Sequence, residues 1–302
     1  MKSFTIHLFA LTSGLASPAL AQDAASTRQA ATADIFYSAD ADDTEVIRYS
    51  LTLDWLHDGP ERRQGVRIEK ALFNPIGQGQ QGRERVYLQA ADGERWKWNA
   101  SIGTDGDTVL GSAAIHNESR FRQEYFIERD ILETPRGLRE GIYYTFAGAS
   151  IDLPVDGRNM VNLLAGVQEF TGDNVRTHIR GNYVHTIDPD LGLSAQLRGR
   201  YFRNSDPREY DYYSPRWYAQ AMPVLQIRRF SQGWRYMAEA GVGVLRDSNS
   251  GWRRSSHLRI ETISPVGKNW AVKASFLCSE TPTAAGLGYE YVQATFGLTR
   301  AF

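Results

Sequence analysis

Charged side chains alternate with apolar ones along several segments in the second half of the chain. At such spacing guanidinium groups can donate hydrogen bonds to an anion, and guanidinium and carboxylate groups can hydrogen-bond the hydroxyls of a sugar. We predict that these residues line a path for a polar polymer or an anion; the alternative is that they pair into an Arg–Glu lattice that only stiffens the wall. The basic candidates are Arg176, Arg180, Arg198, Arg200, Arg228, Arg235, Arg253 and Arg259, and the acidic ones are Glu239 and Glu261.

A catalytic or metal site is not expected from the other polar residues. Ser256 and His257 are adjacent, so on a strand their side chains point to opposite faces and cannot act together. The 6 histidines and 1 cysteine are scattered and fit no zinc or haem spacing. We therefore predict a protein that is not an enzyme and uses no cofactor and no metal. The acidic stretches 40–43 and 206–211 could hold calcium loosely, but solvated loop tips are the interpretation we favour.

Two overall features limit the class of protein. The formal net charge is -1, which gives no basic footprint for nucleic acid. Residues 1–21 have one early lysine, an apolar run and the ending Ala19-Leu20-Ala21, which predicts a cleaved signal peptide of the general secretory pathway. Residues 22–33 are predicted to be a flexible lead-in, and residues 34–302 form the structured domain.

The elements that position the charged residues are predicted to be strands. At the end of the chain, the apolar positions Val292, Ala294, Phe296 and Leu298 alternate with mostly polar or small residues. A period of two places the two sets on opposite faces of a strand. The same alternation over about ten residues, followed by a turn, recurs along the chain and is typical of transmembrane barrel strands.

We predict an all-β fold, a transmembrane antiparallel β-barrel of about sixteen strands, an even number as bacterial barrels require. About fourteen strands remain an alternative, because segments 85–90 and 121–128 alternate poorly. An edge strand of a secreted β-sandwich is the alternative for the last segment. The connections alternate between short turns and longer loops, which favours periplasmic N- and C-termini. Charged faces then line a lumen, and apolar faces contact outer-membrane lipid.

Two local features resemble known bacterial outer-membrane proteins. The terminal Phe302 resembles the signal by which the barrel-assembly machinery recognises its substrates. The stretch Tyr212-Tyr213-Ser214-Pro215, between an acidic, aromatic loop and a strand, resembles a junction in the barrels of cellulose and poly-N-acetylglucosamine exporters. This resemblance covers residues 201–302 most clearly. It implies an outer-membrane pore of a Gram-negative bacterium for an exported polysaccharide, with Tyr210, Tyr212, Tyr213, Ser214 and Pro215 lining or gating the exit.

One departure from that family concerns its periplasmic region. The exporters carry helical tetratricopeptide repeats before the barrel, and no such repeat is present in this sequence. The resemblance therefore implies that the periplasmic adaptor is a separate protein. The alternative function is a non-conducting surface, receptor or structural barrel, similar to phage-adsorption proteins.

Overall fold

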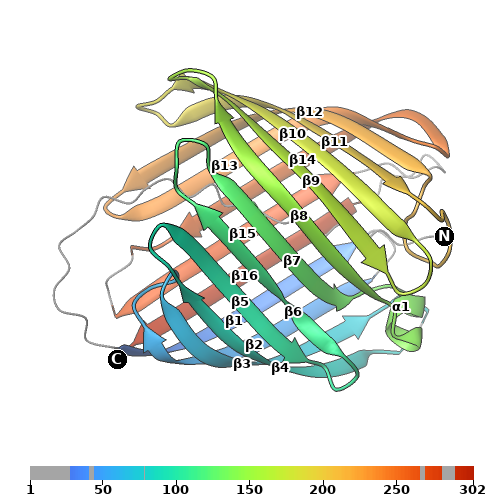
Figure 1. The fold of residues 1–302 in the computed structure, drawn as a ribbon, viewed down its shortest axis with the longest axis horizontal. Helices are drawn as coiled ribbons and strands as arrows, with labels where there is room; N and C mark the ends of the chain where they lie inside the picture. Colours follow the sequence, from blue (N-terminus) through green and yellow to red (C-terminus); the bar gives the residue numbers. More distant parts are fainter. Residues whose placement is uncertain (1–27, 41–43, 78, 266–268, 281–289) are drawn as a thin grey trace.

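The computed structural model describes residues 28–40, 44–77, 79–265, 269–280 and 290–302. Its strands form one closed antiparallel barrel in which each strand pairs with its neighbours in sequence and β1 closes the ring against β16 (Figure 1). The predicted signal peptide lies outside the described residues. The strands are β1 (Arg28–Asp40), β2 (Glu45–His57), β3 (Arg63–Asn74), β4 (Gln81–Asp92), β5 (Trp96–Thr104), β6 (Val109–Asn117), β7 (Gln123–Ile131), β8 (Tyr143–Pro154), β9 (Asn159–Phe170), β10 (Val175–Asp188), β11 (Leu193–Asn204), β12 (Trp217–Ser231), β13 (Trp234–Asp247), β14 (Ser250–Ile263), β15 (Trp270–Glu280) and β16 (Glu290–Ala301).

The sixteen-stranded prediction is confirmed, and the fourteen-stranded alternative and the β-sandwich are wrong. The poorly alternating segments 85–90 and 121–128 lie largely in β4 and β7. Closure leaves no sheet edge with unpaired backbone groups, which is what a sheet needs in order to span a bilayer. Among the described residues, no helix is long and apolar enough to cross a membrane.

The outer surface of the barrel is apolar. On β10, Ile179 and Tyr183 are exposed, whereas Arg176 and His178 are buried on the inner side. The same alternation leaves large apolar side chains exposed on nearly every strand, including Leu53, Leu88, Ile102, Leu197, Leu225 and Val242. An apolar surface of this extent is unfavourable in water and matches the lipid-facing band of a transmembrane barrel.

Strand β1 begins earlier than the sequence suggested. We expected a flexible lead-in over 22–33, but β1 starts at Arg28, and Ala30 to Ala33 pair with both β2 and β16. The alternation is weak there because the segment is rich in alanine and threonine. Barrel closure, which depends on the last strand of the chain, orders these residues.

A short helix, α1 (Pro135–Glu140), occupies the connection between β7 and β8, where only a loop was expected. Thr134 caps it by accepting a hydrogen bond from the Gly137 N–H, and Pro135 fits the first turn. Gly141 is the left-handed cap of the helix, with φ 68°, a conformation that glycine adopts without steric cost. Strand β8 therefore starts at Tyr143.

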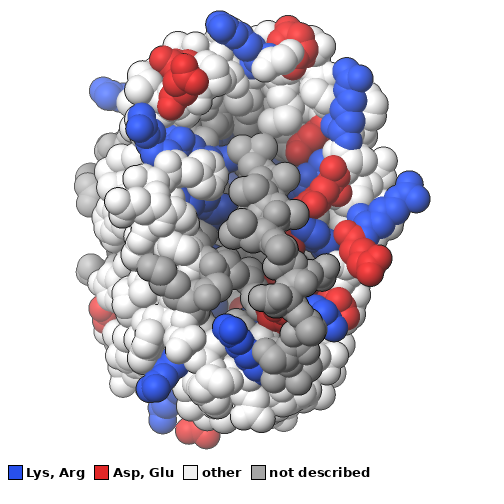
Figure 2. Space-filling view, turned by 90° about the vertical axis from the view of Figure 1, so that its left-hand side faces the viewer, with Lys and Arg blue, Asp and Glu red and all other residues white. Residues whose placement is uncertain are grey.

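The two rims of the barrel differ. The C-terminal rim, at the left of Figure 1, holds Phe302, whose backbone N–H and C=O bond Gln29 at 2.9 and 3.2 Å. The opposite rim, here called the loop rim, carries α1 and the connection 205–216 between β11 and β12. Figure 2 faces the C-terminal rim and shows acidic and basic side chains around the mouth, with basic ones inside the hollow.

Candidate functional site

Part of the predicted basic path is an ion-paired lattice. Arg198 on β11 reaches across β12 and forms two hydrogen bonds with Glu239 on β13, at 3.1 and 2.8 Å. His257 on β14 contacts the same carboxylate at 2.8 Å. Glu261 accepts from Arg235 and from Arg259, both at 2.8 Å. On this side of the lumen the charged side chains are therefore ion-paired, as the lattice alternative describes.

Two further predicted arginines also have acidic neighbours. Arg253, near the loop rim, donates to Asp247 at 3.0 Å. Arg228 lies within electrostatic range of Glu261 and Glu239. The contact between Arg253 and Asp247 joins β14 to β13, so the charge of Arg253 is balanced within the wall.

Arg176, Arg180 and Arg200 form a different environment, here called the basic cluster. Arg180 on β10 and Arg200 on β11 are register partners, so the two like charges lie opposite each other on the lumenal face. In the described part of the chain neither makes an ion pair, and the Nε atom of each is buried without a hydrogen-bond partner. The groups that Arg176 bonds, among the described residues, are uncharged: the Asn204 side-chain oxygen at 2.9 Å and the Tyr213 carbonyl at 2.5 Å.

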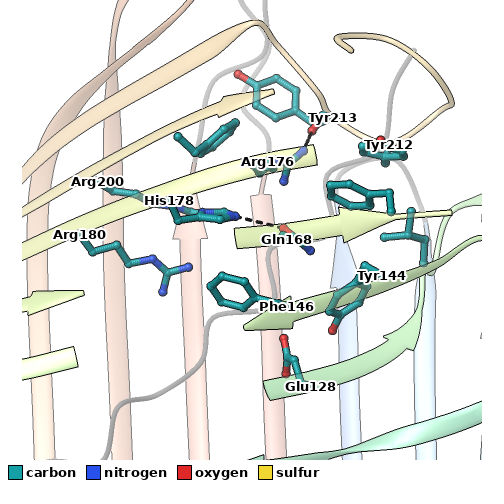
Figure 3. Close-up of a pocket in the computed structure, with 13 residues that line it drawn as sticks. Glu128, Tyr144, Phe146, Gln168, Arg176, His178, Arg180, Arg200, Tyr212 and Tyr213 are labelled. Atoms are coloured by element: carbon teal, nitrogen blue, oxygen red, sulfur yellow. Dashed lines mark hydrogen bonds between the residues drawn. The ribbon is translucent and has the colours of Figure 1, made fainter. Parts of the chain in front are cut away.

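The basic cluster lines a pocket on the lumenal face of β7 to β11 (Figure 3). Among the residues that the structure describes, Glu128 is the only acidic one that lines it, and this side chain is hydrogen-bonded to Tyr144. His178 contacts Gln168 at 3.1 Å through Nε2, while its Nδ1 is buried without a partner. The full lining is Glu128, Leu132, Tyr144, Phe146, Gln168, Phe170, Arg176, His178, Arg180, Arg200, Phe202, Tyr212 and Tyr213.

Aromatic rings pack against two arginines of the basic cluster, Arg176 and Arg200. The Arg176 guanidinium lies 4.7 Å from the centre of the Phe202 ring and 5.0 Å from that of Phe170. The Arg200 guanidinium lies 5.5 Å from the same Phe202 ring. Cation–π contacts of this kind stabilise a guanidinium without neutralising it. The positive charge therefore remains available in the lumen.

The predicted exit loop is a folded part of the pocket. Tyr212 is only 3% exposed, stacks on Phe170 with 4.4 Å between ring centres, and accepts a hydrogen bond from Asn174 at 2.7 Å. Tyr213 donates its hydroxyl to Asp247. Burial raises the pKa of both tyrosines, so both hydroxyls stay protonated. Ser214 accepts from the Arg208 N–H at 2.9 Å, and Pro215 accepts from Asn204.

Acidic residues of this connection bind it to two neighbouring turns. Asp211 accepts from the Thr134 hydroxyl at 2.6 Å and from the Arg136 N–H at 2.7 Å, at the start of α1. Glu209 accepts from the Asp173 and Asn174 N–H groups in the β9–β10 turn. The expectation of a solvated acidic tip over 206–211 is therefore wrong for these two carboxylates, because backbone N–H groups of adjacent turns bind them.

Tyr210 completes the loop and lies nearer its surface. Its ring lies 4.7 Å from the Arg136 guanidinium of α1 and 6.3 Å from the Tyr212 ring. The five predicted loop residues are thus brought together, and two of them, Tyr212 and Tyr213, line the same pocket as the basic cluster.

The sequence did not single out several residues of the pocket. Phe146, Phe170 and Phe202 lie on the lumenal side, where only polar residues were sought. The signal was available, because Phe202 shares the inward parity of Arg198 and Arg200 on β11. Glu128 was missed because segment 121–128 shows no clear alternation.

The other residues considered for catalysis or metal binding are not brought together in the described part of the chain. Ser256 and His257 lie on opposite faces of β14, with His257 bound to Glu239. Within the described ranges, no group of three or more His, Cys, Asp or Glu side chains is placed to hold a metal ion. The acidic stretch 40–43 lies outside the described residues, apart from the Asp40 backbone in β1.

No protein-family model and no curated protein matches this chain. Among solved structures it is similar to a bacterial polysaccharide outer membrane secretin, with a TM-score of 0.67 and 13% identity over 90% of this chain and 98% of that one. The chain has the fold of an outer-membrane β-barrel. Weaker likenesses include OprD of Pseudomonas aeruginosa, with a TM-score of 0.47 and 9% identity over 91% and 95% of the two chains. Another is OmpT of Vibrio cholerae, with a TM-score of 0.45 and 8% identity over 94% and 99%.

Proposed function

We propose that the chain is a pore in the outer membrane of a Gram-negative bacterium and takes part in the export of an exopolysaccharide. The fold shared with a polysaccharide secretin over nearly the full length of both chains supports the proposal. The observation that carries it is the position of Tyr212 and Tyr213, which fold against the lumenal wall at the loop rim. The partly exposed rings of Tyr210 and Tyr213 and the partly exposed amide of Gln168 can contact a sugar chain as it leaves the barrel.

In this proposal the termini are periplasmic and the loop rim faces outward. The longer connections lie on the loop rim, as in other outer-membrane barrels. The signal peptide would direct the chain through the general secretory pathway, and the barrel-assembly machinery would insert it into outer-membrane lipid. A separate periplasmic adaptor would deliver the polysaccharide to the C-terminal rim.

A specific observation favours a second candidate function. The Arg–Glu lattice around Glu239 and Glu261 cross-links part of the wall, as a non-conducting receptor or structural barrel would require. In that case the connection 205–216 would serve as a recognition surface outside the cell. The protein would then pass no sugar chain.

Single-channel conductance of the purified full-length barrel in a planar bilayer separates these two functions. A stable open current that soluble glucan or N-acetylglucosamine oligomers block would support the conduit. A folded barrel that carries no current would overturn it in favour of the receptor. Maltose at the same mass concentration serves as a control for viscosity.

A further inference from the structure

The basic cluster has an unfavourable arrangement for a purely structural element. Like charges opposite each other on neighbouring strands destabilise a sheet, and Arg180 and Arg200 are such a pair. Arg176 adds a third cation on the same face, and within the described ranges Glu128 is the only carboxylate that lines the pocket. Elsewhere in the lumen, Glu69, Glu239 and Glu261 each contact two basic side chains. The basic cluster therefore differs from the rest of the wall in its charge balance.

The hydrogen-bonding groups of the pocket also converge on one space. The guanidinium of Arg180 projects into the cavity between Phe146 and His178 (Figure 3). The Nε atoms of Arg180 and Arg200 are buried donors without a partner in the described part of the chain. A guanidinium offers its donors in a planar fork that matches carboxylate, sulfate and phosphate oxygens. Phe202 packs against the guanidiniums of Arg176 and Arg200 and limits where they can move.

We propose that this pocket binds an oxyanion group, a carboxylate, sulfate or phosphate, through Arg180 and Arg200. Arg176, which is fixed by Asn204 and the Tyr213 carbonyl, is a positioning residue that adds positive potential. Binding places a negative charge between the two opposed guanidiniums and thereby offsets their repulsion. If the barrel exports a polysaccharide, which this step takes from the proposed function, the oxyanion belongs to an acidic sugar of that polymer.

The test measures binding to the purified full-length barrel in a neutral detergent by isothermal titration calorimetry. Sodium sulfate is titrated against sodium chloride of equal ionic strength, followed by glucuronic acid, oligogalacturonate and neutral cello-oligosaccharide. We expect sulfate and oligogalacturonate to bind and the neutral oligomer to bind at least about tenfold more weakly, since it makes no charge-assisted hydrogen bond. If oligogalacturonate binds more tightly than glucuronic acid and sulfate, the ligand of the pocket is an acidic polymer. If the three affinities are equal, the ligand is a small anion. If heat of binding is detected only at molar sulfate, the anion is an adventitious ion only, and the proposal is overturned.

Variants separate binding from folding. Arg180→Gln with Arg200→Gln should weaken oligogalacturonate binding by at least about tenfold and raise the apparent melting temperature, because it removes like-charge repulsion. Arg67→Gln, a lumenal arginine that is ion-paired with Glu69 on β3, is the matched control and should leave binding unchanged. Equal binding in the double variant and the wild type would overturn the proposal.

A variant that reverses the charge of Arg200 gives a second test of oxyanion binding. Arg200→Glu puts a carboxylate opposite Arg180, so it should abolish oxyanion binding while the barrel still folds and migrates normally. A non-conducting barrel that binds oligogalacturonate through Arg180 and Arg200 would overturn polysaccharide export and leave this site standing. A conducting barrel blocked by neutral glucan, but without oxyanion binding, would overturn this site alone.

Discussion

Asp211, in the connection between β11 and β12, accepts a hydrogen bond of 2.6 Å from the hydroxyl of Thr134, the residue that caps the start of α1. The same carboxylate accepts the Arg136 N–H. Asp211 and Thr134 are 77 positions apart in the chain, and their contact joins two connections of the loop rim, the one that contains α1 and the one between β11 and β12. Thr134 in turn accepts from Gly137 within the helix. One carboxylate therefore helps to fix both the helix and the loop that carries Tyr212 and Tyr213.

The first prediction concerns this contact. Asp211→Ala should lower the free energy of unfolding by about 1–3 kcal/mol, the usual cost of leaving such donors without a partner. It should also expose the connection 205–216 to protease. Urea unfolding in micelles and limited proteolysis measure the two effects. Asp206→Ala, in the same connection but with an exposed side chain, is the control, and an equal loss in both variants would contradict the assignment.

The second prediction concerns the lattice around Glu239. Arg198 and His257 both bind this carboxylate, so Glu239→Gln leaves two donors with a weaker acceptor. We expect a loss of about 1.5–3 kcal/mol in the free energy of unfolding, the typical contribution of hydrogen bonds to charged groups. A double-mutant cycle with Arg198→Gln, measured by urea unfolding, isolates the pair. Strictly additive losses would show that the two side chains do not interact.

The strands could be predicted from the sequence because their signal is local. Alternation with a period of two places Ile179 outside and Arg180 inside whatever the neighbouring strand is. Parity likewise gave the lumenal positions of Arg176, Arg198 and Arg200, since apolar residues alternate with them. The start of β1 at Arg28 was not predicted, because the pairing of this segment depends on β16, at the other end of the chain.

Which charges meet could not be predicted, because register and side-chain reach decide it. Arg198 and Arg200 have the same parity on one strand, yet Arg198 reaches Glu239 across β12, whereas Arg200 lies opposite Arg180. The contacts of the loop residues could not be predicted for a similar reason. The sequence around Asp211 predicts a solvated carboxylate, because its partner Thr134 lies in a distant connection.

The third prediction concerns Tyr210 to Tyr213. Deleting them removes Asp211 and the contacts of Tyr212 and Tyr213 with Phe170 and Asp247. Because these contacts lie on the loop rim, we expect the barrel to assemble normally but to release less polysaccharide at the cell surface. Surface glycan staining and heat-modified electrophoretic migration measure release and assembly. Unchanged surface glycan would count against a role of this segment at the exit.

The fourth prediction is a pH dependence at Asp105, just beyond β5. Although burial opposes it, hydrogen bonds from the Tyr143 hydroxyl and two backbone N–H groups, together with Arg83, lower the pKa of this carboxyl. A lowered folded-state pKa contributes stability above the unfolded value of about 3.9, and this contribution is lost as the pH falls further. Asp105→Asn should therefore flatten the fall in the free energy of unfolding below about pH 4. Urea midpoints from pH 5 downward measure it. Asp190→Asn, on an exposed turn, should keep the wild-type slope.

The fifth prediction concerns the C-terminal residue. Phe302 is 65% exposed at the C-terminal rim, so its ring contributes little packing, while its backbone bonds Gln29 in both directions. If the ring is the signal for the assembly machinery, Phe302→Ala should reduce the amount of barrel in outer-membrane fractions while the purified chain still refolds in detergent. Removing the residue should impair both, because the hydrogen bonds with Gln29 are lost too. Phe302→Trp, which keeps an aromatic ring, should assemble normally. Normal insertion of the alanine variant would show that the barrel is recognised through another part of the chain.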